Sequence, residues 1–365
     1  MTTPSTATVS PSSADVTATA RSRRGHRADS GRREKRGLPS IVPGLLLAAL
    51  IALIALEFGS RFPILGAPVA GILMGMVLRN SVGVAPIFRP GLQFSSKTIL
   101  RWSIVGLGFG LSLQQVARTG MDSLVVTLVT ISGALLTAWV LGKWLGIPSR
   151  LKTLIGVGTA ICGGSAIAAV SPIIKSEEHE TAFAISTIFL FDIIGVLTFP
   201  ALGYWMGMSD TGFGTWAGTA INDTASVVAA GYSFSDAAGD YGTVVKLTRA
   251  TMIIPICLGL VAWQMWHNKK AGNTHINFRQ IFPWFILWFV VASAIRSTGL
   301  IPEVLDEPLR FGAKFLIVLA LTAIGLSSDL RRMRHVGLRP VLLGLGVWMS
   351  VIFSSLGVLV LMGVW

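Results

Sequence analysis

The centre of one hydrophobic run, residues 153–174, reads TAICGGSA at positions 159–166. Two adjacent glycines cost about 1 kcal/mol each relative to alanine in a helix interior, and in lipid every freed backbone group needs another partner. The stretch therefore predicts a broken helix whose second half would offer unpaired N–H groups and a positive dipole end to an anion. The candidate substrate-binding residues are Cys162, Gly163, Gly164 and Ser165, with Ser165 as a hydroxyl donor or cap. Tight helix packing through small residues is the alternative.

Similar hydrophobic runs fill the rest of the chain. Of its 365 residues 52% are hydrophobic and only 13% are charged, whereas soluble domains carry about 25% charged residues. A membrane span needs about 20 mostly apolar residues. The sequence offers about eleven candidate spans: 41–58, 63–80, 98–115, 121–142, 153–174, 181–207, 213–234, 241–266, 280–299, 310–328 and 337–363. The predicted fold is therefore an all-α polytopic membrane protein, with a single transmembrane transporter domain over residues 38–365.

The charged residues predict the topology. Residues 1–37 are rich in Ser, Thr and Ala and then basic, with little to bury, which predicts a disordered basic cytoplasmic tail. With this tail inside, the basic clusters at 79–101, 143–152, 269–279 and 331–339 all fall on one side, and the acidic clusters at 177–180, 236–240 and 303–307 fall on the other. The positive-inside rule produces this asymmetry. The net charge of +13 thus indicates membrane orientation, and no nucleic-acid partner is expected.

A second polar stretch interrupts the run 213–234 and reads TAINDTAS at positions 219–226. A carboxylate inside a membrane is costly and is by default a functional candidate. Asp223 is therefore the candidate for binding the coupling ion, a cation or a proton, with Asn222, Thr224 and Ser226 as further polar ligands. The alternative is that this segment lies near an aqueous face and that Asp223 caps a helix.

Three further charged residues lie inside hydrophobic runs. Lys246 and Arg249 are one helical turn apart and share a helix face. Facing the protein interior, they would neutralise a carboxylate or hold an oxyanion, and the alternative is that they snorkel to the surface. Asp192 lies deeper in its run, where it would pair with one of those cations or carry a second proton.

Short internal echoes suggest that the chain contains repeats. Gly158-Thr159-Ala160-Ile161 is echoed by Gly218-Thr219-Ala220-Ile221, and Gly110-Leu111-Ser112 is echoed by Gly325-Leu326-Ser327. Transporters are often built from such repeats, so probable internal repeats are part of the prediction. The loop assignment sends both Gly-Thr-Ala-Ile motifs across the membrane in the same direction, which a simple inverted repeat does not explain.

The sequence gives little support for a cofactor or for enzymatic chemistry. Cys162 and Cys257 have no metal-ligand spacing, and the five histidines are scattered, so neither a metal nor another cofactor is expected. Ser165 has no His or Lys base in its own span, although Lys246 could supply one from another helix. We therefore do not expect an enzyme.

Three motifs together resemble the YeiH family of bacterial inner-membrane proteins. They are CGGSAIAA at 162–169, WAGTAI-x-DT-x-SVVAA at 216–230, and Lys246-x-x-Arg249. The resemblance runs from about residue 41 to the C-terminus and implies the plasma membrane of a bacterium and a role as a sulfate exporter. Many family members carry histidine at the position of Asn222. The family is also similar to the bile-acid and sodium–proton antiporter superfamily, which implies crossing broken helices and alternating access.

These features together predict a secondary active transporter of a small inorganic or organic anion, coupled to or exchanged against H⁺ or Na⁺. Sulfate is implied only by the resemblance. A cation/proton antiporter is the alternative within transport and would need Asp192 and Asp223 close together. An intramembrane enzyme and a structural membrane protein are less favoured alternatives. The expected partners are the anion, the coupling ion and the bilayer, and whether the chain forms a homo-oligomer is left open.

Overall fold

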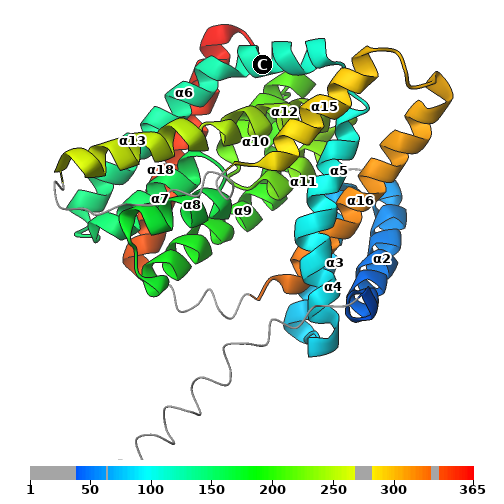
Figure 1. The fold of residues 1–365 in the computed structure, drawn as a ribbon, viewed down its shortest axis with the longest axis horizontal. Helices are drawn as coiled ribbons and strands as arrows, with labels where there is room; N and C mark the ends of the chain where they lie inside the picture. The colour runs from blue at the N-terminus through cyan, green and yellow to red at the C-terminus, as the bar shows by residue number, and fades with distance from the viewer. Residues whose placement is uncertain (1–37, 63–64, 268–281, 330–336) are drawn as a thin grey trace, which may run out of the picture. The chain divides into compact units, whose positions relative to one another are not determined.

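The computed structural model describes residues 38–62, 65–267, 282–329 and 337–365, of which residues 40–365 form one unit. Every regular element in these ranges is a helix (Figure 1). Six of the described helices are long and apolar enough to cross a membrane: Ser40–Arg61, Leu113–Trp144, Glu178–Trp205, Asp236–Trp263, Asp306–Ser327 and Leu338–Met362. The all-α membrane fold is thus confirmed, and the count of eleven spans stays a prediction. The predicted tail, residues 1–37, and the basic residues of 269–279 and 331–334 lie outside the described ranges.

The helices follow one another along the chain with short connections. They are α2 (Leu38–Arg61), α3 (Gly66–Ser81), α4 (Arg89–Phe94), α5 (Leu100–Gly108), α6 (Leu113–Trp144), α7 (Ser149–Ala160), α8 (Gly164–Ile174), α9 (Glu178–Trp205), α10 (Asp210–Ala220), α11 (Thr224–Phe234), α12 (Asp236–Thr251), α13 (Ile253–His267), α15 (Trp284–Ser297), α16 (Asp306–Ser327) and α18 (Leu338–Met362). Short 3₁₀ turns cover Pro86–Phe88 and Glu303–Leu305, and a π-helical turn covers Ser95–Ile99 between α4 and α5.

The boundary between the third and fourth predicted spans was placed too far along the chain. The structure ends α5 at Gly108 and begins α6 at Leu113, whereas the hydrophobic runs predicted 98–115 and 121–142. The reason is a capping box at Ser112, whose hydroxyl accepts from the N–H of Gln115 while the Gln115 side chain accepts from the N–H of Ser112. This local signal starts the helix before its hydrophobic part begins.

The eighth predicted span is bent rather than straight. It consists of α12 and α13, separated at Met252. Pro255 lies in the first turn of α13 and has no N–H to donate to the carbonyl of Thr251, so the helix cannot continue without interruption. The bend places Ala250 and Ile253 on the wall of the cavity described below.

The buried residues form two hydrophobic cores. The smaller core joins α2, α3, α4 and α16, and the larger one contains most of the helices from α6 to α12 together with α18. In the smaller core α3 and α16 approach very closely: a Cβ added at Gly75 would lie 2.6 Å from the carbonyl oxygen of Thr322, and one at Gly325 would lie 2.3 Å from that of Ile72. Small residues that let two backbones meet in this way are common in membrane helices.

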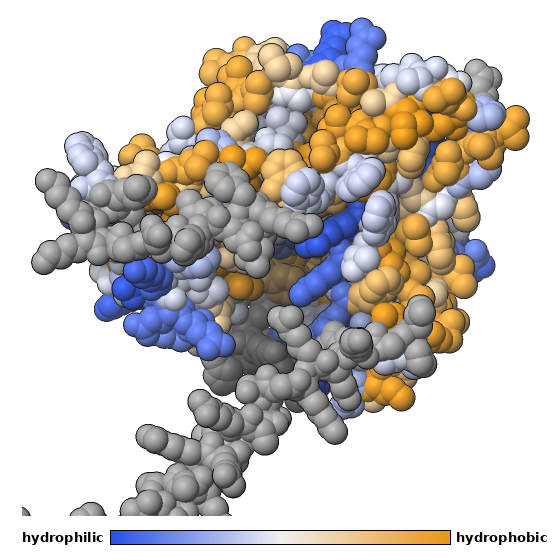
Figure 2. Space-filling view, in the orientation of Figure 1, coloured by the Kyte–Doolittle hydropathy of each residue, from blue (hydrophilic) through white to orange (hydrophobic). Residues whose placement is uncertain are grey.

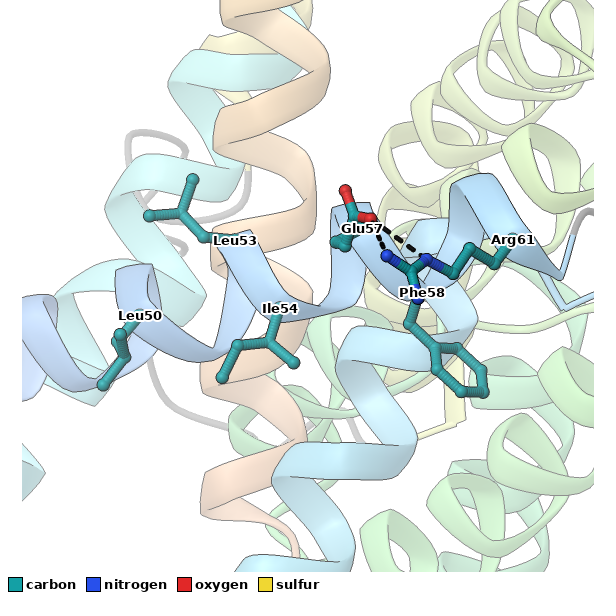
Figure 3. A pocket seen from close by; sticks show the side chains of 6 residues that line it. All are labelled: Leu50, Leu53, Ile54, Glu57, Phe58 and Arg61. Carbon is teal, nitrogen blue, oxygen red and sulfur yellow. Dashed lines mark hydrogen bonds and ion pairs between the residues drawn. The ribbon is translucent and has the colours of Figure 1, made fainter.

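The outer face of α2 carries a shallow hollow of about 430 Å³ (Figure 3). All its lining residues come from this one helix: Leu50, Leu53, Ile54, Glu57, Phe58 and Arg61. Arg61 pairs with Glu57 at 2.8 Å, and both side chains are more than 60% exposed. Because one helix cannot enclose a ligand, we assign this face to contact with lipid. Figure 2 shows that much of the visible surface is similarly apolar.

Candidate functional site

Both predicted helix breaks are present. Residues 161–163 separate α7 from α8, and residues 221–223 separate α10 from α11. Ile161 departs from helical geometry at φ −118° and ψ −86°, while Gly163 has φ 65° and ψ −127°, a conformation that favours glycine. In the second break, Ile221 and Asp223 are extended. Both Gly-Thr-Ala-Ile motifs occupy equivalent places, since each ends the first half-helix. The wider internal repeat remains a prediction.

The paired glycines of the first break provide a matched test. Gly163→Ala is expected to lower the free energy of unfolding by about 1–3 kcal/mol, because alanine strongly disfavours the positive φ of this position. Gly164→Ala should change it by less than about 1 kcal/mol, because Gly164 has negative φ and a Cβ there meets no atom within 4 Å. Thermal unfolding of both variants in detergent would check this. Equal stability of the two would show that the backbone of the break is not fixed as described.

Lys246 joins the two breaks. Its Nζ donates to the carbonyl oxygen of Ile161 at 2.9 Å and to that of Ile221 at 2.8 Å. The ammonium is fully buried and so neutralises the negative ends of two half-helices, α7 and α10, at once. The polar stretches 159–166 and 219–226 therefore meet, as the shared-site hypothesis required.

Arg249 completes the first of these helix ends. The guanidinium is fully buried and donates to the carbonyl oxygens of Ala160 and, at 3.0 Å, Thr159. Carbonyls at a helix C-terminus have no partner within the helix, and in lipid they must find one elsewhere. The sequence analysis expected Lys246 and Arg249 to bind a carboxylate or an oxyanion. The structure gives both side chains backbone carbonyls instead, and neither lines the cavity described below. The alternative that they snorkel to the surface is wrong.

Asp192 and Asp223 lie at the start of α11. Oδ1 of Asp192, on α9, accepts from the backbone N–H groups of Asn222 and Asp223, each at 3.0 Å. Oδ2 of Asp223 accepts from the N–H of Ala225 at 2.9 Å, so Asp223 caps α11. Asp192 is buried and Asp223 is half-buried. Asp192 thus binds backbone at a positive helix end rather than a cation, and the predicted capping role of Asp223 is confirmed.

Asn222 and Trp348 complete the second break. The Asn222 side chain is buried, and neither its oxygen nor its nitrogen has a partner among the described residues. Trp348, on α18, donates from Nε1 to the carbonyl oxygen of Ala220 at 2.9 Å. The sequence analysis missed this role of Trp348, because a tryptophan within a hydrophobic run carries no local sign that it will satisfy the end of another helix.

A cavity of about 1050 Å³ opens beside both breaks. Its lining includes Cys162, Gly164 and Ser165 from the first break and Asp223 and Thr224 from the second. The N-terminal ends of α8 and α11 therefore share this space. Gly163, Asn222 and Ser226 are not among the lining residues, which corrects the substrate contacts predicted for their side chains.

The opposite wall of the cavity carries two cations that the sequence analysis counted only as topology signals. Lys97 lies in the π-helical turn and Arg101 lies one turn later in α5, and both side chains are exposed and line the cavity. Neither forms an ion pair with any described residue. Figure 2 shows hydrophilic side chains in the region of α4 and α5, within a largely apolar face. A π-turn within an α-helix is itself a frequent mark of a functional site.

The fold and the site together define an all-helical membrane protein with two broken helices around a partly polar cavity. The chain belongs to the family described as conserved hypothetical protein 698, whose model matches residues 43–344.

Several relatives cover nearly the whole chain, and each is named a UPF0324 membrane protein. One from Streptococcus pyogenes serotype M18 is 45% identical over 337 residues, which is 89% of this chain and 98% of the relative. One from Streptococcus mutans is 43% identical over 88% of this chain and 97% of the relative, and one from Clostridium tetani is 41% identical over 86% and 94%. The resemblance to the YeiH family is confirmed by these matches.

Proposed function

We propose that this protein is a secondary transporter of small anions that binds its substrate in the cavity between α8, α11 and α5. The observation that carries the proposal is that both broken helices contribute the start of their second half to one cavity. Discontinuous helices whose N-terminal ends point at an anionic group are a recurring arrangement of transporters.

The charges around the cavity favour an anion. Two helix N-termini contribute the positive ends of their dipoles, and Ser165 and Thr224 add hydroxyl donors there. Lys97 and Arg101 add two full positive charges from the other side. The one carboxylate that lines the cavity is Asp223, to which we assign the coupling ion; a proton or Na⁺ there would offset its negative charge when the anion binds.

An ion-pair cluster at the far end of the same helices supports alternating access. It consists of Tyr232, Asp236, Asp240, Arg310 and Lys314, with Lys314 2.6 Å from Asp236, Arg310 3.9 Å from Asp240, and a Tyr232–Asp240 hydrogen bond. The α11 helix runs about 16 Å from Thr224 towards this cluster, and α16 runs about 21 Å from Ile324 to Arg310, at 1.5 Å per residue. The cavity thus lies at one end of these helices, while ion pairs join α12 to α16 at the other.

The orientation of this arrangement follows from the positive-inside rule. Lys97 and Arg101 belong to a basic cluster predicted to face the cytoplasm, and Asp236 and Asp240 belong to an acidic cluster predicted to face outside. The cavity would therefore be open to the cytoplasm, and the ion-pair cluster would close the outer side. This is the state in which an exporter loads its substrate, in the plasma membrane of a bacterium.

A cation/proton antiporter is the second candidate, and one observation favours it. The sequence analysis required Asp192 and Asp223 to be neighbours, and Oδ1 of Asp192 lies 3.0 Å from the backbone nitrogen of Asp223. Paired carboxylates at a broken helix suit a proton and a cation. Anion transport remains the better supported proposal because Lys97 and Arg101 would repel a cation from the same cavity. An intramembrane enzyme is less supported, since the hydrogen bonds described for Lys246 go to carbonyls and not to Ser165.

Blocking the cavity at Ser165 would test the anion carrier. In a background with Cys162→Ser and Cys257→Ser, which removes both native cysteines, Ser165→Cys is alkylated with a bulky maleimide after reconstitution into liposomes. Because Ser165 is exposed to the cavity, we expect uptake of labelled sulfate or benzenesulfonate to fall at least about tenfold, the loss that corresponds to about 1.4 kcal/mol.

The matched control is Ser60→Cys in the same background, on the exposed side of α2. Its alkylation should leave uptake unchanged. Uptake that survives complete alkylation at position 165 would rule out this cavity as the path of the anion, and cation-driven proton movement without anion uptake would establish the antiporter instead.

A further inference from the structure

The walls of the cavity say more about the substrate than its charge alone. A cavity of about 1050 Å³ corresponds in size to sites that hold drug-sized molecules, which lie at about 300–1,000 Å³. An inorganic oxyanion is much smaller than this. It would touch the polar groups at one end and leave the rest of the space to water.

Most of the remaining lining is aromatic or aliphatic. Trp102 on α5 and Trp284, Phe285 and Trp288 on α15 all line the cavity. Tryptophan rings provide large apolar surfaces with defined geometry, and they stack on planar or apolar groups. The exposed fractions of Trp102 and Trp288 are 58% and 52%, so much of each ring is available for contact.

The polar groups occupy particular parts of this lining. Ser165 and Thr224 stand at the two helix N-termini, while Lys97 and Arg101 stand on α5 and its preceding turn. A few polar groups that orient a ligand within otherwise apolar walls are the usual composition of sites for organic molecules. A hydrated inorganic ion gains nothing from apolar walls, whereas an apolar body is stabilised in proportion to the area it buries.

We propose that the substrate is an organic anion, a sulfonate or carboxylate with a planar or apolar body, whose charged group binds at the N-termini of α8 and α11 and whose body lies against the aromatic wall. This inference rests on the proposed function and narrows its substrate class. Sulfate, which the family resemblance implies, would then be at most a weak substrate.

Competition in proteoliposomes would test the inference. Uptake of labelled benzenesulfonate by the wild-type protein is measured against unlabelled sulfate, methanesulfonate and benzenesulfonate. We expect benzenesulfonate to compete at a concentration at least about tenfold lower than sulfate does, with methanesulfonate between them. Sulfate that competes as well as benzenesulfonate would overturn the substrate class while leaving anion transport intact. Absence of uptake for every labelled anion, sulfate included, would overturn the proposed function and this inference with it.

Variants at Trp288 identify the wall that is responsible. Trp288→Ala should remove most of the preference for benzenesulfonate over sulfate, and Trp288→Phe should retain it. The matched control is Trp139→Ala on α6, because Trp139 is 58% exposed and does not line the cavity. A Trp288→Ala protein that weakens both anions equally would show a merely structural role for this ring and would contradict the inference.

Discussion

Replacement of Lys246 by methionine is expected to abolish anion uptake and to lower the free energy of unfolding by at least about 2 kcal/mol. Methionine fills a similar volume but cannot donate to the carbonyls of Ile161 and Ile221. Each buried carbonyl left without a partner costs about 1–3 kcal/mol, and two are freed at once. The two half-helices then lose the group that holds their ends together.

Thermal unfolding in detergent and uptake by proteoliposomes would measure these two effects. The control is Lys143→Met near the end of α6, where the lysine is exposed; this change should shift stability by less than about 1 kcal/mol. A Lys246→Met protein as stable and active as the control would refute the role of Lys246 in joining the breaks.

Asp223→Asn is expected to reduce gradient-driven anion uptake to the level of protein-free liposomes while leaving membrane insertion intact. Asparagine caps a helix about as well as aspartate does, so the start of α11 should be preserved. What the substitution removes is the carboxylate that lines the cavity next to the anion site. The expected loss is therefore one of coupling and not of folding.

Uptake under an imposed pH or Na⁺ gradient would be compared between wild type and Asp223→Asn at matched protein levels. Asp122→Asn serves as the control, since Asp122 is exposed on α6 and lies outside the cavity. Full gradient-driven uptake by Asp223→Asn would eliminate the coupling role of this carboxylate and leave Asp192 as the remaining candidate.

The sequence was sufficient to predict local features of the site. Adjacent glycines at 163 and 164 and the polar run at 222–224 conflict with an unbroken apolar helix, and both positions are broken in the structure. The hydrophobic runs predicted the helical membrane fold for the same reason, because their signal is contained within about 20 residues. Features encoded in one short segment could thus be found from that segment alone.

The partners of these features could not be predicted in the same way. Carbonyls freed by a broken helix have no residue signature, so the sequence placed Lys246 on an interior face but assigned it a carboxylate or an oxyanion. Trp348 satisfies a helix end 128 residues away in the chain. Lys97 and Arg101 were overlooked because a basic residue near a span end also serves as a topology signal, and only the folded chain places them on the wall of the cavity.

Counterflow in proteoliposomes tests the central claim of an anion carrier most directly. Liposomes that contain the wild-type protein are loaded with unlabelled benzenesulfonate and diluted into a trace of the labelled compound, with a parallel series that uses sulfate. A carrier that alternates between two sides exchanges internal for external anion, so we expect label to accumulate transiently above its equilibrium level with at least one of the two. Label that enters no faster than into protein-free liposomes in both series would contradict the account.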